Sequence, residues 1–290
     1  MVLALLLLAC GSSDPTDTSD VADTGAPTDP LGGTAPLAEV SAGACPEGFA
    51  AGGAIALTSN GKAREVEVIV PASGASGAPV VFVWHPLGGS AQDMIRWLRL
   101  RAWADEVGAV VVVPDALSTN LYEWGFFGDP TDDLTLYDDL RTCLVQELAV
   151  DPGRFSATGM SAGALWTTYL GMHRGETLAT ILPFSGGTPE GIMTYESPAS
   201  PMPVLLFHGG EDDIYAGGLV DFYDATFAFA DSLVADGHFV VMCDHGMGHT
   251  LPYEAGDAMT QWLPGQIFAE PSAFAQGDVT ALAPYCEVYR

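Results

Sequence analysis

Ser161 has the local sequence of an activated nucleophile. It lies at the centre of GMSAG, which matches the pattern G-x-S-x-G. The pattern alone is a weak signal, because the chain contains 34 glycines. Its context is more specific: residues 154–158 are typical of a strand and those from about 162 of a helix, the strand-turn-helix arrangement of a nucleophile elbow. The hydroxyl would then lie at a helix N-terminus, whose free N–H groups favour negative charge.

A serine hydroxyl reacts as a nucleophile only when a base takes its proton, and histidine is the usual base. The chain has six histidines. We expect His249 to be the base, with His245 as the alternative, because both follow the predicted strand at 239–243 and so lie at the sheet edge where functional groups gather. His208 ends another predicted strand, and we expect it to support the loop that carries the acid.

The acid that orients the base is expected in HGGEDD, directly after the predicted strand at 204–207. Its role would be to hold the imidazole in one tautomer and to stabilise the imidazolium. Asp212 is the preferred residue and Asp213 the alternative. A solvated acidic turn is the competing interpretation, but the order of serine, acid and histidine favours a catalytic triad.

An oxyanion hole needs two backbone N–H donors aimed at the developing negative charge. We expect one from Ala162, directly after the nucleophile, and one from residues 85–90, which follow the predicted strand at 80–84. Pro86 has no N–H, so the second donor is Leu87 or Gly88.

The elements that would position these groups alternate between short apolar runs and helical periodicities, a pattern typical of an α/β domain with a mostly parallel central sheet and helices on both faces. VVFVW and VVVVP are continuous apolar runs suited to central strands. The expected strands are 65–71, 80–84, 110–114, 154–158, 180–184, 204–207 and 239–243; the expected helices are 91–107, 134–148, one from about 162, and 218–235.

Composition excludes some functions. The chain has 290 residues, with 9 basic and 37 acidic side chains and a formal net charge of -28. Nucleic-acid binding needs a basic footprint, and no basic patch is visible. No nucleotide-binding glycine pattern follows the first predicted strand, and no close spacing of Cys and His indicates a metal site. We therefore expect no nucleic-acid partner, no cofactor and no metal.

The first ten residues, MVLALLLLAC, read as a lipoprotein signal segment. Leu7 to Cys10 resembles a bacterial lipobox, in which Cys10 would be lipidated; an ordinary cleaved signal sequence is the alternative. Residues 11–44 are rich in Ser, Thr, Asp, Pro and Gly and predict a disordered tether, followed by one domain over 45–290. Both interpretations predict an extracytoplasmic protein, either secreted or held at the cell envelope by a lipid at Cys10.

Cys45, Cys143, Cys243 and Cys286 remain, an even number in an oxidising compartment, so two disulfides are expected with three possible connectivities. Cys45 and Cys286 flank the domain, and a bond between them would tie its ends together. Cys143–Cys243 then follows by elimination. Buried free thiols are the alternative.

Together, DPGRFSAT before GMSAG, HGGEDD, GHTLP and HPLGGSAQDM resemble the secreted polyhydroxybutyrate depolymerase and feruloyl esterase group of the α/β-hydrolases, over about residues 65–262. The resemblance implies the α/β-hydrolase fold and hydrolysis of carboxylic esters through an acyl-enzyme. It puts Ser161, Asp212 and His249 on the triad positions and Leu87 on the loop oxyanion position. The expected substrates are short or aromatic esters, or hydroxyalkanoate oligomers.

Two departures from the group affect the substrate more than the chemistry. The oxyanion loop begins His-Pro where the group has His-Gly, and GHTLP has Leu251 where the group has Trp. The aromatic residues after VVVVP would line an acyl pocket or belong to the core; they are Tyr122, Trp124, Phe126 and Phe127. A peptidase or acyl transferase on the same scaffold, and an inactive ligand-binding lipoprotein, are the alternative functions.

Overall fold

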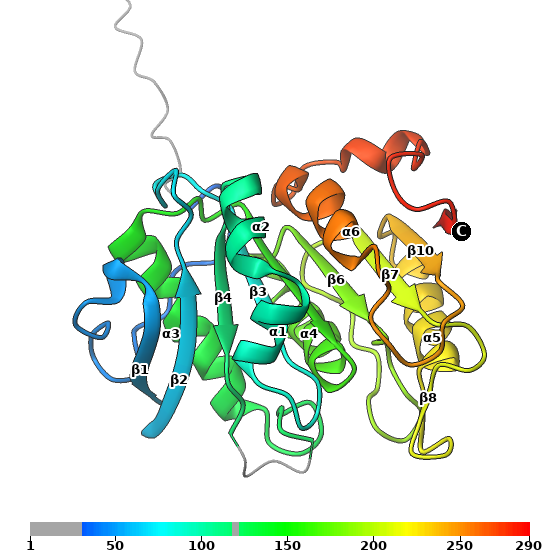
Figure 1. Ribbon diagram of the computed structural model, residues 1–290, viewed down its shortest axis with the longest axis horizontal. Helices are drawn as coiled ribbons and strands as arrows, with labels where there is room; N and C mark the ends of the chain where they lie inside the picture. The colour runs from blue at the N-terminus through cyan, green and yellow to red at the C-terminus, as the bar shows by residue number, and fades with distance from the viewer. Residues whose placement is uncertain (1–30, 118–121) are drawn as a thin grey trace, which may run out of the picture.

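A nine-stranded mixed sheet forms the centre of the protein (Figure 1). The computed structural model describes residues 31–117 and 122–290. Cys10 and the signal segment lie outside the described residues, as does the first part of the expected tether. The sheet has the strand order β1-β2-β4-β3-β5-β6-β7-β10-β11. The strands are β1 Gly53–Ser59, β2 Lys62–Ile69, β3 Val80–Trp84, β4 Val110–Pro114, β5 Phe155–Met160, β6 Thr180–Phe184, β7 Val204–His208, β10 Val240–Asp244 and β11 Cys286–Tyr289.

The six neighbouring strands from β4 to β10 are all parallel, whereas β1, β2 and β11 pair antiparallel at the two edges. The inner strands β3 to β7 are buried along their whole length. Burial on both faces explains their unbroken apolar sequences. A separate two-stranded ribbon, β8 Ile214–Tyr215 and β9 Val220–Asp221, follows β7.

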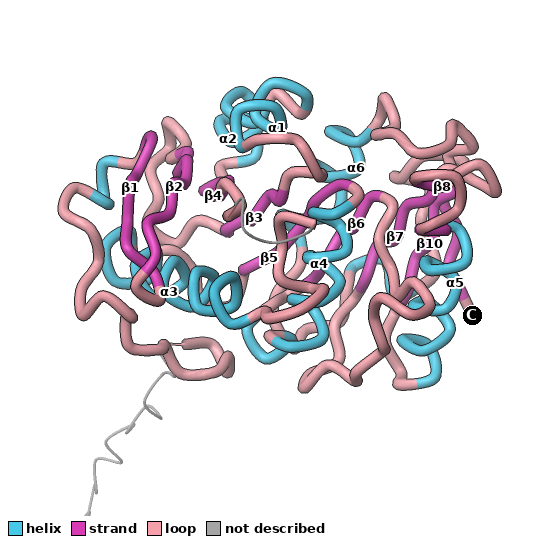
Figure 2. Tube along the Cα trace, turned by 90° about the horizontal axis from the view of Figure 1, so that it is seen from below, coloured by secondary structure: helices cyan, strands magenta, loops and turns pink. Residues whose placement is uncertain are grey.

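Helices cover both faces of the sheet (Figure 2). One face carries α1 Ala91–Trp97, α2 Leu100–Val107 and α6 Ala255–Trp262; the other carries α3 Thr131–Leu148, α4 Ala162–His173 and α5 Phe222–Ala235. Each face has its own hydrophobic cluster, because alternate residues of a strand point to opposite sides. The expected α/β-hydrolase architecture is confirmed. Among the described residues, no helix has the length and apolar character needed to cross a membrane.

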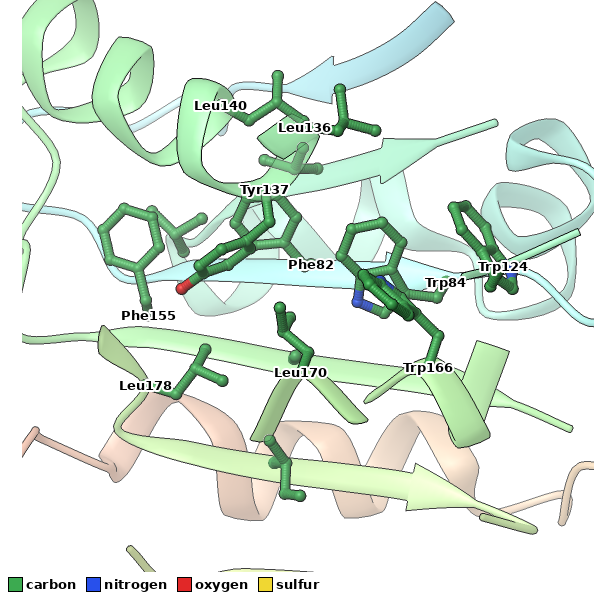
Figure 3. Packing of buried hydrophobic residues seen from close by; sticks show 14 of the residues in the cluster. Phe82, Trp84, Trp124, Leu136, Tyr137, Leu140, Phe155, Trp166, Leu170 and Leu178 are labelled. Carbon is green, nitrogen blue, oxygen red and sulfur yellow. The ribbon is translucent and has the colours of Figure 1, made fainter. Parts of the chain in front are cut away.

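An aromatic cluster fills the core between the sheet and the pair α3 and α4 (Figure 3). Trp84 at the end of β3 makes edge contacts with Trp124 and Trp166, with ring centroids 5.0 and 6.1 Å away. All three indoles are fully buried. Trp124 therefore belongs to the core, and it anchors the loop after β4.

The helix expected over 91–107 is two helices with a corner between them. Arg99 has φ 51°, in the left-handed region, and this interrupts the helical hydrogen bonds. Leu98 and Leu100 on either side are both buried in the cluster on this face. The corner lets both leucines face the sheet, which a straight helix would not allow because adjacent residues point in different directions. The strands β1 and β11 and the helix α6 were not predicted.

Residues 31–44 differ from the expected disordered tether, because they pack on α3. Arg141 donates hydrogen bonds to the Thr34 hydroxyl (2.8 Å) and the Ala35 carbonyl (2.9 Å). Asp139 accepts hydrogen bonds from the backbone N–H and the hydroxyl of Ser41. Both charged side chains are buried and need such partners. The ordered part of the chain therefore begins before the expected boundary at Cys45.

Two disulfides are present, as expected, but the predicted pairing is wrong. Cys45 bonds to Cys143 on α3, and Cys243 on β10 bonds to Cys286 on β11. Cys243 and Cys286 are register partners on adjacent antiparallel strands. The error follows from the missed strand β11, which brings Cys286 to the sheet edge and away from the N-terminal segment.

The pairing predicts which peptides stay joined when the unreduced protein is digested. We expect Cys45 with Cys143 and Cys243 with Cys286; a peptide joining Cys45 to Cys286 would contradict the fold.

Replacing both Cys45 and Cys143 by alanine should lower the free energy of unfolding by roughly 3–5 kcal/mol, because the bond closes a long loop in the unfolded chain. Denaturant titration of the double variant measures this loss.

Candidate active site

Ser161 occupies a sharp turn between β5 and α4. Its φ of 56° and ψ of -119° lie outside the regions that ordinary residues adopt. The backbone hydrogen bond from Ser161 N–H to the carbonyl oxygen of Phe184 on β6 (3.0 Å) contributes to holding the turn. The residue is 8% exposed. The strand-turn-helix prediction for GMSAG is thus met, and the strained turn presents the hydroxyl beside the first turn of α4.

The two glycines of GMSAG are required by close packing of backbone. A Cβ on Gly163 would lie 2.1 Å from the carbonyl oxygen of Trp84, and one on Gly159 would lie 2.5 Å from the carbonyl oxygen of Gly163. Because the obstructing atoms are backbone, no side-chain movement would relieve the clash. The end of β3, the turn at Ser161 and the start of α4 can pack this closely only with glycine at both positions.

His249 bridges Ser161 and a carboxylate. Its Nε2 is 2.8 Å from the Ser161 hydroxyl oxygen, and its Nδ1 is 2.7 Å from Oδ1 of Asp213. The imidazole lies nearly parallel to the ring of Phe222, with centroids 4.5 Å apart and an interplanar angle of 16°. The preference for His249 over His245 agrees with this geometry: no hydrogen bond of the described residues joins His245 to Ser161 or Asp213.

The carboxylate that contacts His249 is Asp213 and not Asp212, so the structure contradicts the preferred acid and favours the alternative. Asp213 is fully buried, whereas Asp212 is exposed. A hydrogen bond from Asp213 N–H to the carbonyl oxygen of Gly210 closes the turn, and this turn directs the second aspartate inward. Gly209 permits the arrangement, because a Cβ there would lie 2.0 Å from the carbonyl oxygen of Gly248 in the loop that carries the histidine.

Three donors satisfy the buried carboxylate of Asp213. Oδ2 accepts from the Ser185 hydroxyl and from Gly209 N–H, both at 2.8 Å, and Oδ1 faces His249. Burial raises the pKa of Asp213, but the hydrogen bonds from His249, Gly209 and Ser185 outweigh it, so the pKa of Asp213 is below its usual value. The acid is therefore ionised at neutral pH, as the partner of an imidazolium must be.

His208 supports the acid loop, as expected. It is 2% exposed, and its Nδ1 accepts a hydrogen bond from Gly210 N–H at 3.2 Å. Burial lowers the pKa of His208 against the opposing influence of Asp244 and Asp213, which favours the neutral ring that this acceptor role requires. The carbonyl oxygen of His208 also accepts from His245 N–H, so one residue holds the starts of both loops that complete the triad.

The loop after β3 distinguishes between the two candidate oxyanion donors. Gly88 N–H donates to Oε2 of Glu123 at 3.0 Å and is therefore occupied. The hydrogen bonds of the described residues give no acceptor to the N–H of Leu87 or Ala162, which line the same hollow as Ser161. Leu87 and Ala162 are thus the two backbone donors available to an oxyanion.

Glu123 was not predicted as a site residue. It lies in the loop after β4 with φ 69°, and Oε2 is also 3.6 Å from Nδ1 of His85. Next to it, the indole N–H of Trp124 donates to the carbonyl oxygen of His85 at 2.8 Å. These contacts hold the start of the oxyanion loop. No sequence motif signals the role, because the contact joins two loops 35 residues apart.

Two hollows adjoin the triad, one lined by Ser161 and one by His249. One, with a volume of about 20 Å³, is lined by Ser161, Leu87 and Ala162 together with apolar side chains that include Tyr122 and Phe126. The other is an open cleft of about 630 Å³ lined by His249 and the residues that follow it. The aromatic residues after β4 therefore divide: Tyr122 and Phe126 line the small hollow, Trp124 is core, and Phe127 is 42% exposed.

Comparison with known proteins gives likenesses to esterases in sequence and structure. No protein-family model matches the chain. "Putative esterase NocK" of Nocardia uniformis is 29% identical over 145 residues, which is 48% of this chain and 41% of that protein. "Feruloyl esterase D" of Neurospora crassa is 24% identical over 168 residues, or 53% of this chain and 55% of that protein. The chain thus spans about half the length of these curated relatives.

Solved structures match over more of the chain. A complex of a pOPH variant with DMSO has a TM-score of 0.70 at 17% identity and covers 85% of this chain and 95% of the other. Native sOPH gives a TM-score of 0.66 at 21% identity, with coverage of 85% and 96%. An esterase from Pyrobaculum calidifontis gives 0.53 at 20% identity, with coverage of 72% and 82%. The chain therefore shares the α/β-hydrolase fold of these structures.

Proposed function

We propose that the protein is a serine hydrolase of carboxylic esters that works through an acyl-enzyme. The observation that carries the proposal is the unbroken chain of hydrogen bonds from Ser161 through His249 to the buried Asp213, at 2.8 and 2.7 Å. Two free backbone N–H groups beside the serine complete the requirements for acyl transfer. The names of the two curated relatives favour an ester as the bond that is cleaved.

In the first half of the reaction, the Ser161 oxygen attacks the ester carbonyl carbon while Nε2 of His249 takes its proton. The carbonyl oxygen becomes an oxyanion that accepts hydrogen bonds from the N–H groups of Leu87 and Ala162. When the tetrahedral intermediate collapses, the imidazolium returns its proton to the departing alkoxide oxygen. The products are a free alcohol and an acyl group bound to Ser161. Asp213 stabilises the imidazolium throughout.

In the second half, water attacks the acyl carbon, and His249 takes its proton. The new tetrahedral intermediate uses the same two N–H donors. Its collapse returns the proton to the Ser161 oxygen and releases the carboxylic acid. None of these reaction steps uses a cofactor or a metal. Among residues 31–117 and 122–290, no cluster of His, Cys, Asp and Glu is arranged to hold a metal ion.

The small hollow favours a short acyl group. The oxyanion donors hold the carbonyl oxygen, so the acyl chain must extend from there into the hollow that Leu87 and Ala162 also line. A volume of about 20 Å³ suits a group of one or two carbons. Side chains of Tyr122, Ile192 and Phe222 line the space, so a larger aromatic acid would crowd against them. Esters of short acids are therefore favoured over esters of aromatic acids.

We infer that the protein works outside the cytoplasm, as a cell-envelope lipoprotein with a lipid at Cys10 or as a secreted protein. The two disulfides support this, because such bonds form and persist in oxidising compartments.

Replacing Ser161 by alanine should abolish hydrolysis of p-nitrophenyl acetate, because the variant has no nucleophile. We expect a fall in kcat of about 10⁴-fold or more. Circular dichroism and the thermal midpoint check that the fold is kept. A fluorophosphonate probe should label the wild-type protein and not the variant; full activity of the variant, or no labelling of the wild type, would refute the proposal.

Variants of the two neighbouring aspartates test which of them is the acid of the triad. Asp213→Asn should lower kcat on p-nitrophenyl acetate by about 10³- to 10⁴-fold, because the amide cannot stabilise the imidazolium or hold the same tautomer. The matched variant Asp212→Asn changes an exposed side chain next to it and should keep activity within about twofold. Equal losses in both variants, or loss only at position 212, would overturn the assignment of Asp213.

Glu123 should act as a positioning residue for the oxyanion loop. Glu123→Ala removes the acceptor of Gly88 N–H and should lower kcat by about tenfold with little change in KM, because the loop loses its preorganised shape. Glu123→Gln keeps an acceptor oxygen and should recover most of the activity. If both variants lose activity equally, or if KM changes and kcat does not, Glu123 does not position the oxyanion hole.

A further inference from the structure

The open cleft beside His249 is shaped to take one part of the substrate. Its volume is about 630 Å³, far more than that of the hollow lined by Ser161. One wall is the corner between α1 and α2, at residues 97–99, and the other is the segment 249–257 between β10 and α6. We call it the leaving-group cleft.

The chemistry of the triad indicates which part of the ester enters the small hollow and which part enters the large cleft. In the proposed mechanism His249 gives its proton to the departing oxygen, so the alcohol part of the ester must lie against His249. His249 lines the large cleft, whereas the oxyanion donors Leu87 and Ala162 line only the small hollow. The acyl group therefore enters the small hollow, and the alcohol extends into the large cleft.

Arg99 stands out among the cations of this acidic protein. The chain has nine basic residues, all within its described part. Five of them form ion pairs with carboxylates, and Arg141 and Arg154 donate hydrogen bonds to oxygen atoms of the chain. Arg290 is the last residue. The side chains of Arg99 and Arg290 form no hydrogen bond or ion pair with the described residues, and of these two only Arg99 lines the leaving-group cleft.

The corner at Arg99 keeps this side chain at the cleft. Leu98 and Leu100, buried at 8% and 0% exposure, anchor the backbone on both sides, and the left-handed conformation of Arg99 turns it away from the core. Such a conformation is unfavourable for a residue with a long side chain. The structure thus holds an exposed guanidinium in the cleft that His249 also lines, in a protein whose formal net charge is -28.

The remaining walls are aromatic and weakly polar. Trp97 is 55% exposed and Tyr253 is 93% exposed, and both line the cleft. Exposed rings of this kind provide flat surfaces for an aromatic or cyclic group. Asp257 also lines the cleft and forms no ion pair with Arg99, so the guanidinium is not neutralised from that side.

From this arrangement we propose that the leaving alcohol is a bulky, ring-containing group that carries a carboxylate, and that Arg99 binds this carboxylate. Guanidinium and carboxylate match in geometry and form charge-assisted hydrogen bonds. The inference rests on the proposed ester hydrolysis and deepens it: a short acyl group esterified to a hydroxy acid would satisfy both spaces.

The test compares two esters that differ in one charge, 4-acetoxybenzoate and methyl 4-acetoxybenzoate. Both place an acetyl group in the small hollow, and only the first has a free carboxylate. Arg99→Gln should raise KM for 4-acetoxybenzoate by about five- to tenfold, the size expected of a partly exposed charged hydrogen bond, and leave kcat within about twofold. The methyl ester should change by less than about twofold in both constants.

Arg101→Gln is the matched control. Arg101 lies two residues further on, is similarly exposed and pairs with Glu67 away from the cleft. It should leave the kinetics of both esters unchanged. If Arg99→Gln affects the two esters equally, or if Arg101→Gln reproduces its effect, the carboxylate site is refuted.

A binding measurement tests the carboxylate site at Arg99 independently of the proposed ester hydrolysis. In Ser161→Ala, which should not turn over the ester, calorimetry measures the Kd of intact 4-acetoxybenzoate with and without Arg99→Gln. A five- to tenfold weaker Kd in the double variant supports the site even if the wild type cleaves neither ester, and in that case only the proposed reaction fails. Equal Kd values would overturn the role of Arg99.

Discussion

A single buried carboxylate organises the site. Asp213 has no contact with water, and an ion in that position is stable only when hydrogen bonds replace its hydration. The donors come from the ends of three different strands: Ser185 follows β6, Gly209 follows β7 and His249 follows β10. The requirement to satisfy one carboxylate therefore draws three loops together, and the position of the imidazole over Ser161 is one result.

The second constraint is steric, and it acts on the other side of Ser161. The contact between Gly163 and the backbone at Trp84 brings the start of α4 against the end of β3, from which the oxyanion loop departs. Ala162 begins α4, and Leu87 lies in the loop that follows β3. The nucleophile and both donors are consequently held by backbone packing, whereas the acid and base are held by hydrogen bonds.

The sequence is informative where chemistry depends on local structure. GMSAG predicts the turn because the glycines and the strained serine are neighbours, and apolar runs locate the strand ends at which His249 and the acid loop begin. It does not separate Asp212 from Asp213, because the direction of each side chain depends on how the turn closes against Gly210 and on donors from β6. The disulfide partner of Cys286 likewise depends on the pairing of a short edge strand, a contact between distant segments. Glu123 and the corner at Arg99 follow from loop packing and from burial of Leu98 and Leu100, neither of which has a sequence pattern.

The bond between Cys243 and Cys286 lies close to the catalytic base along the chain. Cys243 is near the end of β10, and the loop that carries His249 begins directly after that strand. The disulfide therefore links the start of this loop covalently to β11. In a reducing compartment this tie would open while Ser161 and its elbow stayed intact, so the base would lose precision before the nucleophile did. The disulfide thus couples the geometry around the catalytic base to the redox state of the surroundings.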